Sequence, residues 1–500
     1  MPPGAGLKCD PYSIRIACPA LLVITRKISY SRAIRRGANA FRREDALRNI
    51  SFLTACFLAL FAAGSARAQQ SAPASIDDKR AEQATPGAAS GDEKRDVKTY
   101  TLSPEEYERA VTYSAAMYRL HFIRIAYSLL LLFMILRLGV SATFRNAAET
   151  LTRRRYAQAV IFVPLIFILY NAMRLPLDAY VQHLALKYDM SIQGWGSWLR
   201  DWTKGKLVST AMATVVVYFF YEVVRRSPRR WWLYSGLAVL PLLAFFNFLA
   251  PIVLQPIFNK FEPLSKNNPA LVQEIEKLAT RGQLEIPRER MFEMKASEKL
   301  RSLNAYVAGF GASKRIVVWD TTVENMTQPQ ALFVIGHEMG HYVLGHISKS
   351  IAFASVVTLL ILYLVYRSIN WPLERWGKRR GLRGIEDWAS LPALMFLFLL
   401  FVFLAEPVTN SFSRYQEHEA DVYGLEVTHG VVPDSRQAAA EAFQILGELD
   451  LADPQPSAFI KIWLYSHPPL AERLEFASGY DPWAKGEPTR FVPSAGLTGQ

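Results

Sequence analysis

Residues 331–341 read ALFVIGHEMGH, an apolar run that ends in an HExxH motif. His337 and His341 are four residues apart, so on a helix they project from one face, one turn apart. Such a pair can present two imidazoles to one Zn²⁺, and Glu338 can then take a proton from a water molecule. The alternative is a helix that carries two histidines by chance. Because the chain has only 8 histidines, this spacing beside a glutamate favours a metal site.

The composition indicates a membrane protein. Of the 500 residues, 51% are hydrophobic and 12% aromatic, and the mean hydropathy is +0.08, which is too apolar for an ordinary soluble enzyme of this length. Six long apolar runs are flanked by arginine, lysine or tryptophan, as transmembrane helices are. They cover 122–140, 159–173, 207–224, 232–250, 351–366 and 391–405. The alternative, a set of buried core helices, does not account for these flanks.

The net charge of +13 is attributed to membrane topology. Basic residues cluster beside the apolar runs at 145–155, 225–230 and 375–383. By the positive-inside rule these loops are cytoplasmic, which places the HEMGH segment on the extracytoplasmic side of a plasma or inner membrane. The sequence lacks a basic face interleaved with aromatic residues, so no nucleic-acid partner is expected.

The first hundred residues are predicted to be a leader followed by a linker. Basic residues in 42–48 precede an apolar stretch at 51–64, and Ala66-Arg67-Ala68 fits a small-x-small cleavage site, which is the pattern of a secretory signal peptide. The alternative is a retained first helix, which would make a seventh span. Residues 69–100 have little to bury and are predicted to be a disordered linker.

Cysteine usage restricts the chemistry of a metal site. Cys9, Cys18 and Cys56 are the three cysteines of the chain, and all precede residue 68. The rest of the chain therefore has neither disulfides nor cysteine ligands. Zinc would have to be held by histidine and carboxylate, which favours a catalytic over a structural site.

Two polar regions, 251–349 and 406–500, are large enough to form a water-facing domain. The sequence predicts one helix at 101–121, whose start signal is Ser103-Pro104, and another at 269–282. Proline in Gln328-Pro329-Gln330 suits the first turn of the HEMGH helix. Short strands are predicted at 290–294, 305–307 and 314–319.

A third zinc ligand is sought because a catalytic zinc usually has three protein ligands and one open position. Residues 417–421, EHEAD, follow the last apolar run. On a helix, Glu417 and Asp421 share a face, so Glu417 could bind zinc while Asp421 hydrogen-bonds a ligand histidine from behind. The alternative is a solvated acidic helix. His418 and His346 are rival ligands, but His346 is five residues beyond His341 and is predicted to point away from the metal.

The order of these motifs resembles the type I CAAX prenyl protease family, which are integral-membrane zinc metallopeptidases. The HExxH motif is followed by an apolar hairpin and then by SRYQEHEAD at 413–421. Further segments that resemble the family are AP at 250–251, FNKFEPL at 258–264, NAY at 304–306, GF at 309–310, KRIV at 314–317, SHPPL at 466–470 and Arg473. The resemblance covers most of 101–480 and leaves out residues 1–100.

The resemblance implies roles for individual residues. Glu417 would be the third zinc ligand and Asp421 the aspartate behind it. His467 and Arg473 would face the active site, where an imidazole or guanidinium can stabilise the oxyanion of a tetrahedral intermediate. The alternative for His467 is a structural histidine before a Pro-Pro turn.

The resemblance also implies a substrate-binding strand. Asn304 and Ala305 would expose a strand edge to which a peptide adds as a further strand. The alternative is an ordinary edge strand. Eukaryotic members of the family are expected to have seven spans and a cytosolic catalytic domain, which would put the basic loop 225–230 outside. Either the leader is cleaved and the site faces outward, or the positive-inside rule fails at that loop.

The sequence thus predicts a predominantly α-helical integral membrane protein with six or seven transmembrane helices and a small α+β zincin-like catalytic domain. The expected segments are a leader at 1–68, a linker at 69–100, about four spans within 101–250, the first catalytic part at 251–349, a transmembrane hairpin at 350–405, the second catalytic part at 406–480 and a tail at 481–500.

The expected function is that of a zinc endopeptidase, with one Zn²⁺ ion, that cuts membrane-associated or exported polypeptides. The alternative is a non-proteolytic transporter or chaperone with a structural zinc site. Transporters usually place ionisable residues within their spans, whereas here the polar candidates lie at the ends of spans or in the water-facing regions. The sequence carries no signal for an oligomeric state.

Overall fold

The computed structural model describes residues 97–309 and 314–493. The predicted signal peptide, its alternative as a seventh span, and residues 69–96 of the predicted linker lie outside the described residues. So do Phe310 of the quoted GF motif and the last seven residues of the tail.

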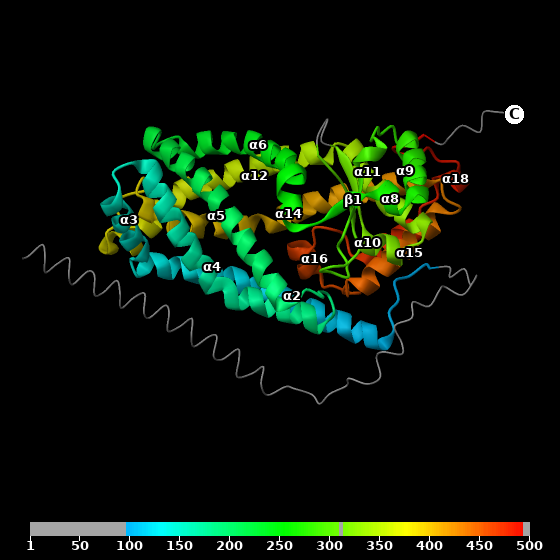
Figure 1. The fold of residues 1–500 in the computed structure, drawn as a ribbon, viewed down its shortest axis with the longest axis horizontal. Helices are drawn as coiled ribbons and strands as arrows, with labels where there is room; N and C mark the ends of the chain where they lie inside the picture. Colours follow the sequence, from blue (N-terminus) through cyan, green and yellow to red (C-terminus); the bar gives the residue numbers. More distant parts are fainter. Residues whose placement is uncertain (1–96, 310–313, 494–500) are drawn as a thin grey trace, which may run out of the picture. The chain divides into compact units, whose positions relative to one another are not determined.

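Five of the six predicted apolar runs lie wholly in helices, and the first, 122–140, is helical except for the turn at 138–139. Among the described residues, six helices are long and apolar enough to cross a membrane. Their main parts are α2 (Pro104–Arg137), α4 (Arg155–Lys187), α5 (Trp195–Arg226), α6 (Trp231–Leu249), α12 (His346–Ser368) and α14 (Leu391–Thr428). Neighbours far apart in the sequence include α6 and α12, which run side by side (Figure 1). The predicted transmembrane fold is confirmed.

Five of these helices are longer than the apolar runs that predicted them, because polar turns extend them beyond the apolar part, whereas α6 matches its run to within one residue at each end. In α2 the helix predicted at 101–121 and the first span are one element. Its start is fixed by a capping box, in which Glu106 N donates to the Ser103 hydroxyl and Ser103 N donates to the Glu106 carboxylate. In α14 the helix passes without a break from the apolar run through residues 417–421.

Shorter helices connect and cover these elements. They are α3 (Val140–Leu151), α7 (Gln255–Phe258), α8 (Leu264–Asn267), α9 (Pro269–Arg281), α10 (Asp320–Asn325), α11 (Gln328–Val343), α13 (Asn370–Pro372), α15 (Ser435–Leu449), α16 (Ala458–Leu464), α17 (Leu470–Gly479) and α18 (Pro482–Lys485). The predicted helix at 269–282 and the predicted start of the HEMGH helix are both confirmed.

The small sheet has four strands in the order β1-β2-β4-β3. Their bounds are Phe261–Pro263 for β1, Met291–Met294 for β2, Ala305–Ala308 for β3 and Arg315–Trp319 for β4. Strands β2 and β4 are parallel, and the two outer pairings are antiparallel. The three predicted strands are confirmed within one residue or so. Strand β1 was not predicted, because three residues that end in proline carry no periodic signal.

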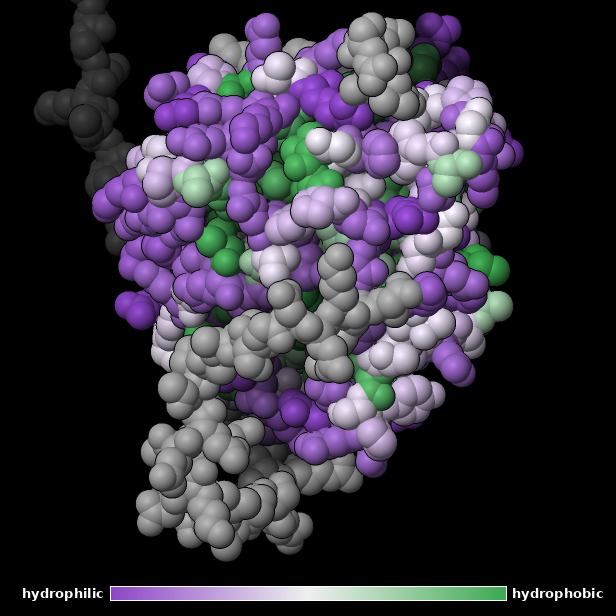
Figure 2. Space-filling view, turned by 90° about the vertical axis from the view of Figure 1, so that its right-hand side faces the viewer, coloured by the Kyte–Doolittle hydropathy of each residue, from purple (hydrophilic) through white to green (hydrophobic). Residues whose placement is uncertain are grey.

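A hydrophobic core joins this sheet to the HEMGH helix. Ile275 and Leu278 of α9, Ile316 of β4 and Ile335 of α11 are buried in one cluster. The side of the molecule that carries α9, α15 and α18 has a largely hydrophilic surface (Figure 2), as a water-facing domain requires. The sheet therefore provides a rigid support that fixes α11 from one side while α14 packs on the other.

Candidate active site

The HExxH motif lies in the second half of α11, where it packs against the last turns of α14. Close approach of the two helices depends on glycines. A Cβ at Gly340 would lie 3.0 Å from Tyr423, and a Cβ at Gly424 would lie 3.1 Å from the backbone nitrogen of His337. A larger side chain at either position would push the helices apart. This contact brings the EHEAD segment of α14 to the two histidines of α11.

Three of the predicted site residues converge. Nε2 of His337 and Nε2 of His341 are 3.2 Å apart. The Glu417 carboxylate lies 3.3 Å from Nε2 of His341 and 3.4 Å from Nε2 of His337. Among the described residues these three form the one group of His, Cys, Asp or Glu side chains with the spacing for a metal ion.

This donor set fits a zinc ion. With Zn–N bonds of about 2.0–2.1 Å, two ligand atoms of a tetrahedral site are about 3.3 Å apart, which matches the distances among the three side chains. Oε2 of Glu417 is also buried, and no donor in the described part of the chain hydrogen-bonds to it. A buried carboxylate oxygen in that state is costly unless a cation satisfies it.

The carboxylate behind the first histidine is Asp421. Its Oδ1 lies 2.9 Å from Nδ1 of His337, on the side of the ring away from the other two donors. Arg473 donates to both oxygens of Asp421, at 2.9 and 2.6 Å, and both residues are buried. The guanidinium also stacks over the Phe443 ring, 4.5 Å from its centroid. The hydrogen bonds of Arg473 are therefore made mainly to Asp421, whose position they fix.

The electrostatics of α11 reflect this surrounding. Burial alone would lower the pKa of His337, but the carboxylates of Asp421 and Glu417 beside its ring raise the pKa to about 10. A metal ion must displace that proton, so its binding is expected to release a proton. Burial raises the pKa of Glu338 above its ordinary value, which moves this carboxyl toward the range useful for a general base.

A cavity of about 500 Å³ opens in front of these residues. Glu338, Glu417, His467 and Arg473 contribute to its wall, together with Asn304 at the start of β3. The opposite wall is built by side chains of α2 and of the segment after α15, including Tyr113, Tyr118, Asp450 and Asp453. The cavity therefore lies between the water-facing domain and the first membrane helix, and side chains of both line it.

His467 reaches the site from the segment between α16 and α17. Its Nε2 is 3.3 Å from the Glu417 carboxylate, and Ser466 Oγ is 2.9 Å from its Nδ1. Helix α14 holds this segment, because Arg414 donates to the carbonyl oxygens of Lys461 and Tyr465. Arg414 lies on the same helix as the Glu417 carboxylate, so one element positions both groups. Sequence reasoning quoted Arg414 within a motif but gave it no role.

Strand β3 is an edge strand of the sheet. Trp319 N donates to Asn304 O, so the pair formed by Ala305 and Val318 is a non-hydrogen-bonded pair. The N–H and C=O groups of Ala305 consequently point away from β4, toward the open edge. The backbone of Asn304 is used within the fold, since its N–H and C=O also contact the Thr322 hydroxyl.

The predicted position of His346 is partly wrong. The residue is not in the metal group, but its Nδ1 lies 3.0 Å from Nδ1 of His341, so it does not point away from the site. Helix α11 ends at Val343, Gly345 has φ 69°, and α12 begins at His346. The prediction carried one helical rotation across this break, although glycine after a helical run is a stop signal. The rival ligand His418 is exposed and packs its ring against Phe476.

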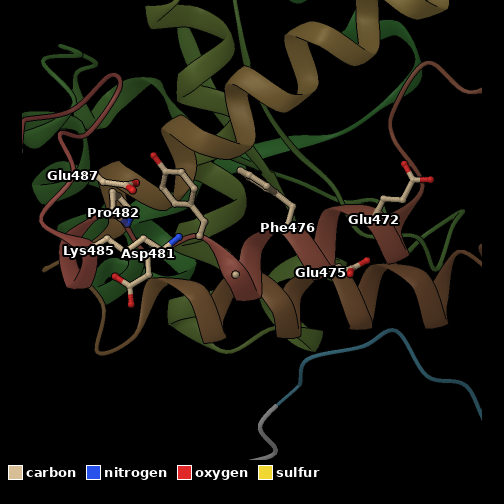
Figure 3. A pocket seen from close by; sticks show the side chains of 9 residues that line it. Glu472, Glu475, Phe476, Asp481, Pro482, Lys485 and Glu487 are labelled. Atoms are coloured by element: carbon tan, nitrogen blue, oxygen red, sulfur yellow. The ribbon is translucent and has the colours of Figure 1, made fainter.

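A second hollow lies on the surface over α17 and α18 (Figure 3). It is lined mainly by acidic and aromatic side chains, among them Glu475, Tyr480 and Asp481, and it holds none of the residues that converge on α11. The chemistry of the donor set therefore assigns the site to the cavity at α11.

Comparison with known proteins agrees with this geometry. Residues 265–481 match the model of peptidase family M48, and residues 95–260 match the model of the CAAX prenyl protease N-terminal region, described as five membrane helices. An uncharacterized metalloprotease of Bacillus subtilis, YhfN, is 35% identical over 75% of this chain and 86% of its own. A CAAX prenyl protease 1 homolog of Oryza sativa is 28% identical over 75% of this chain and 87% of its own.

The fold has a counterpart among solved structures. The crystal structure of S. mikatae Ste24p aligns with a TM-score of 0.65 at 24% sequence identity, and the match covers 76% of this chain and 90% of that one. The membrane helices and the small sheet domain thus share the architecture of a known structure.

Proposed function

Because the chain belongs to peptidase family M48 and is an integral membrane metalloprotease, we propose that it is a zinc endopeptidase that cuts membrane-associated or exported polypeptides. The observation that carries the proposal is the convergence of His337, His341 and Glu417 at zinc-ligand spacing beside Glu338. Relatives named CAAX prenyl protease 1 in rice and yeast support a membrane-associated substrate.

In the proposed mechanism, zinc held by the three converging side chains would supply Lewis acidity toward water and the scissile carbonyl. Glu338 takes a proton from the attacking water and delivers it to the leaving amine. His467 donates a hydrogen bond to the oxyanion of the tetrahedral intermediate. Asp421, held by Arg473, keeps the ring of His337 in the orientation and tautomer that leave Nε2 free.

The substrate is proposed to bind along β3. The N–H and C=O groups of Ala305 face the open edge, and the side chain of Asn304 lines the cavity. A peptide added there as an antiparallel strand would run past Glu338. Backbone pairing accepts many sequences, which suits a protease that acts on varied polypeptides.

Metal analysis together with peptide cleavage tests the proposed function. The purified protein is expected to contain about one zinc per chain and to cut an unstructured peptide. A chelator should abolish cleavage, and zinc should restore it. Bound zinc without any cleavage would favour the transporter or chaperone alternative, and a protein that binds no metal would overturn the proposal.

Replacing His467 by asparagine is expected to lower kcat by about 10²-fold, because removal of one oxyanion donor typically has that effect. KM should change little, since the interaction forms only in the transition state. Steady-state kinetics on one peptide measure both constants. His183→Asn, an exposed histidine of α4 outside the cavity, is the matched control. An unchanged kcat would make His467 a structural residue.

We further propose that the site faces the extracytoplasmic side. Contacts of the three basic loops with one another and with residues 387–388 support this: Arg145 pairs with Asp387, Arg383 pairs with Glu149, and Arg225 stacks over Trp388. The loops therefore lie at one end of the membrane helices. Helices α12 and α14 run from the site to that end, so the site is at the opposite end. With the basic end inside, a reporter fused after Gln500 would be extracytoplasmic.

A further inference from the structure

Two buried polar residues lie directly behind the second histidine of the motif. His346 is 2% exposed and Glu419 is 6% exposed. Nδ1 of His346 is 3.0 Å from Nδ1 of His341, and Nε2 of His346 is 3.4 Å from Oε2 of Glu419. Nε2 of His346 and Oε2 of Glu419 are both buried, and among the described residues neither has any other hydrogen-bond partner. The closest group that can form a hydrogen bond with either of these atoms is therefore the other one.

The chemistry of the rings allows one consistent assignment of protons. Nε2 of His341 faces His337 and Glu417, so a neutral His341 that binds a cation there carries its proton on Nδ1. The nitrogen of that N–H lies 3.0 Å from Nδ1 of His346, which can accept its hydrogen bond. The proton of a neutral His346 is then on Nε2, which points at Glu419. The result is a continuous chain from ligand to carboxylate.

Other residues keep this chain in place. Oε1 of Glu419 accepts hydrogen bonds from the Tyr415 hydroxyl and from Arg490, both at 2.9 Å. The backbone carbonyl of His346 accepts from Gln416, whose side-chain oxygen in turn accepts from Ser350. The first turn of α12 is thereby tied to the turn of α14 that carries Glu417. The arrangement is thus more than a packing contact between two rings.

We propose that His346 and Glu419 form a hydrogen-bonded relay that fixes the tautomer and orientation of His341 for metal binding. The relay is the counterpart of Asp421 behind His337, where a carboxylate acts directly. Outer partners of this kind orient the ligand ring, increase its basicity and typically change metal affinity 10–100-fold. The proposal rests on the proposed function, because it needs a metal at His341.

Two other roles for His346 give different expectations. As a fourth metal ligand it would have to direct a nitrogen at the ion, but its Nδ1 faces the Nδ1 of His341, on the far side of that ring from His337 and Glu417. As a packing residue it could be replaced by an apolar side chain of similar size without effect on the metal. Only the relay makes metal affinity depend on both His346 and Glu419.

The test is the zinc dissociation constant of the full-length protein in detergent, measured by competition with a chelator after metal removal. His346→Leu removes both nitrogens and is expected to weaken zinc binding by about 10–100-fold. His346→Asn keeps an acceptor close to the position of Nδ1 but loses the link to Glu419, so its loss should be smaller. Glu419→Gln should weaken binding too, because it replaces the charged acceptor.

Controls separate the relay from the site and from folding. His418→Leu and His418→Asn repeat the substitutions at the neighbouring exposed histidine and should leave zinc affinity unchanged. The visible spectrum of the Co²⁺-substituted protein should shift in the His346 variants and not in the His418 variants. Thermal unfolding of the metal-free proteins identifies a variant that fails to fold. If His346→Leu does not fold, the zinc affinity of Glu419→Gln tests the relay instead.

The possible results are distinct. Wild-type affinity in His346→Leu, or in Glu419→Gln if the leucine variant does not fold, overturns the relay while leaving the proposed function intact. A wild-type protein that binds no zinc overturns the proposed function itself. Weakened binding in both variants, with His418 variants unchanged, supports the relay.

Discussion

Replacing Glu338 by glutamine is expected to lower kcat for peptide hydrolysis by about 10³-fold or more while zinc stays bound. Apart from the proposed ligand His337, the Glu338 carboxylate is the one titratable group of α11 among the described residues that line the cavity, and general base catalysis typically contributes 10²–10⁴-fold. Glutamine has the same shape but does not accept the proton at neutral pH. The three proposed ligands are untouched, so zinc content should remain at the wild-type value.

Single-turnover kinetics and elemental analysis of the same preparation measure the two quantities. Glu324→Gln, at an exposed glutamate of α10, is the control for a change from carboxylate to amide. Retained activity in Glu338→Gln would exclude the residue as the general base. Loss of zinc with loss of activity would instead make Glu338 part of the metal site.

Replacing Glu417 by glutamine is expected to weaken zinc binding by more than about 100-fold, beyond the range for an outer partner. The change removes the negative charge that faces both imidazoles at 3.3 and 3.4 Å. An amide oxygen is a weaker donor to zinc than a carboxylate, which belongs to the usual ligand set. Activity should fall with the metal and recover in part at high zinc concentration.

Chelator competition and activity as a function of free zinc measure this effect. Glu475→Gln changes an exposed glutamate of α17, near the surface hollow of Figure 3, and should bind zinc like the wild type. If Glu417→Gln binds zinc with unchanged affinity, the third ligand lies elsewhere and the proposed site is wrong.

Features with a local signal were predicted correctly from the sequence. The membrane helices follow from unbroken apolar runs, and the starts of α2 and α11 follow from Ser103 and from Gln328-Pro329. Strand β4 follows from its nearly continuous β-branched residues. In each case the free energy that decides the structure comes from residues adjacent in the sequence, so the pattern is sufficient.

Features that depend on packing between distant segments were not predicted. The contact of Gly340 with Tyr423, the hold of Arg414 on the segment before His467, and the contact of His346 with His341 all join residues through tertiary structure. Strand β1 exists because β2 offers it a partner. Periodicity contains none of this information, since each contact depends on where two elements cross.

The meeting of Glu417 with the two histidines is an intermediate case. The spacing within HEMGH and within EHEAD predicted which side chains share a face, while the pairing of the two segments came from the resemblance to a family. The structure brings the side chains together because α14 continues as a helix past the apolar run. A break after residue 405 would have left the same motifs apart.

The uninterrupted α14 also fixes the distance between its apolar run and Glu417. Glu417 is twelve residues beyond Ala405, the end of the apolar run, which is about 18 Å along a helix at 1.5 Å per residue. In the proposed peptidase, this helix would hold the cutting point at that distance from the end of the apolar run whatever the sequence of the substrate. With the end of the apolar run at the membrane surface, a lipid-anchored substrate of the proposed peptidase would have to extend about five residues from its anchor, at about 3.3–3.6 Å each, to be cut. The number of residues between the anchor and the cleaved bond, rather than the side chains around that bond, would then determine where cleavage occurs.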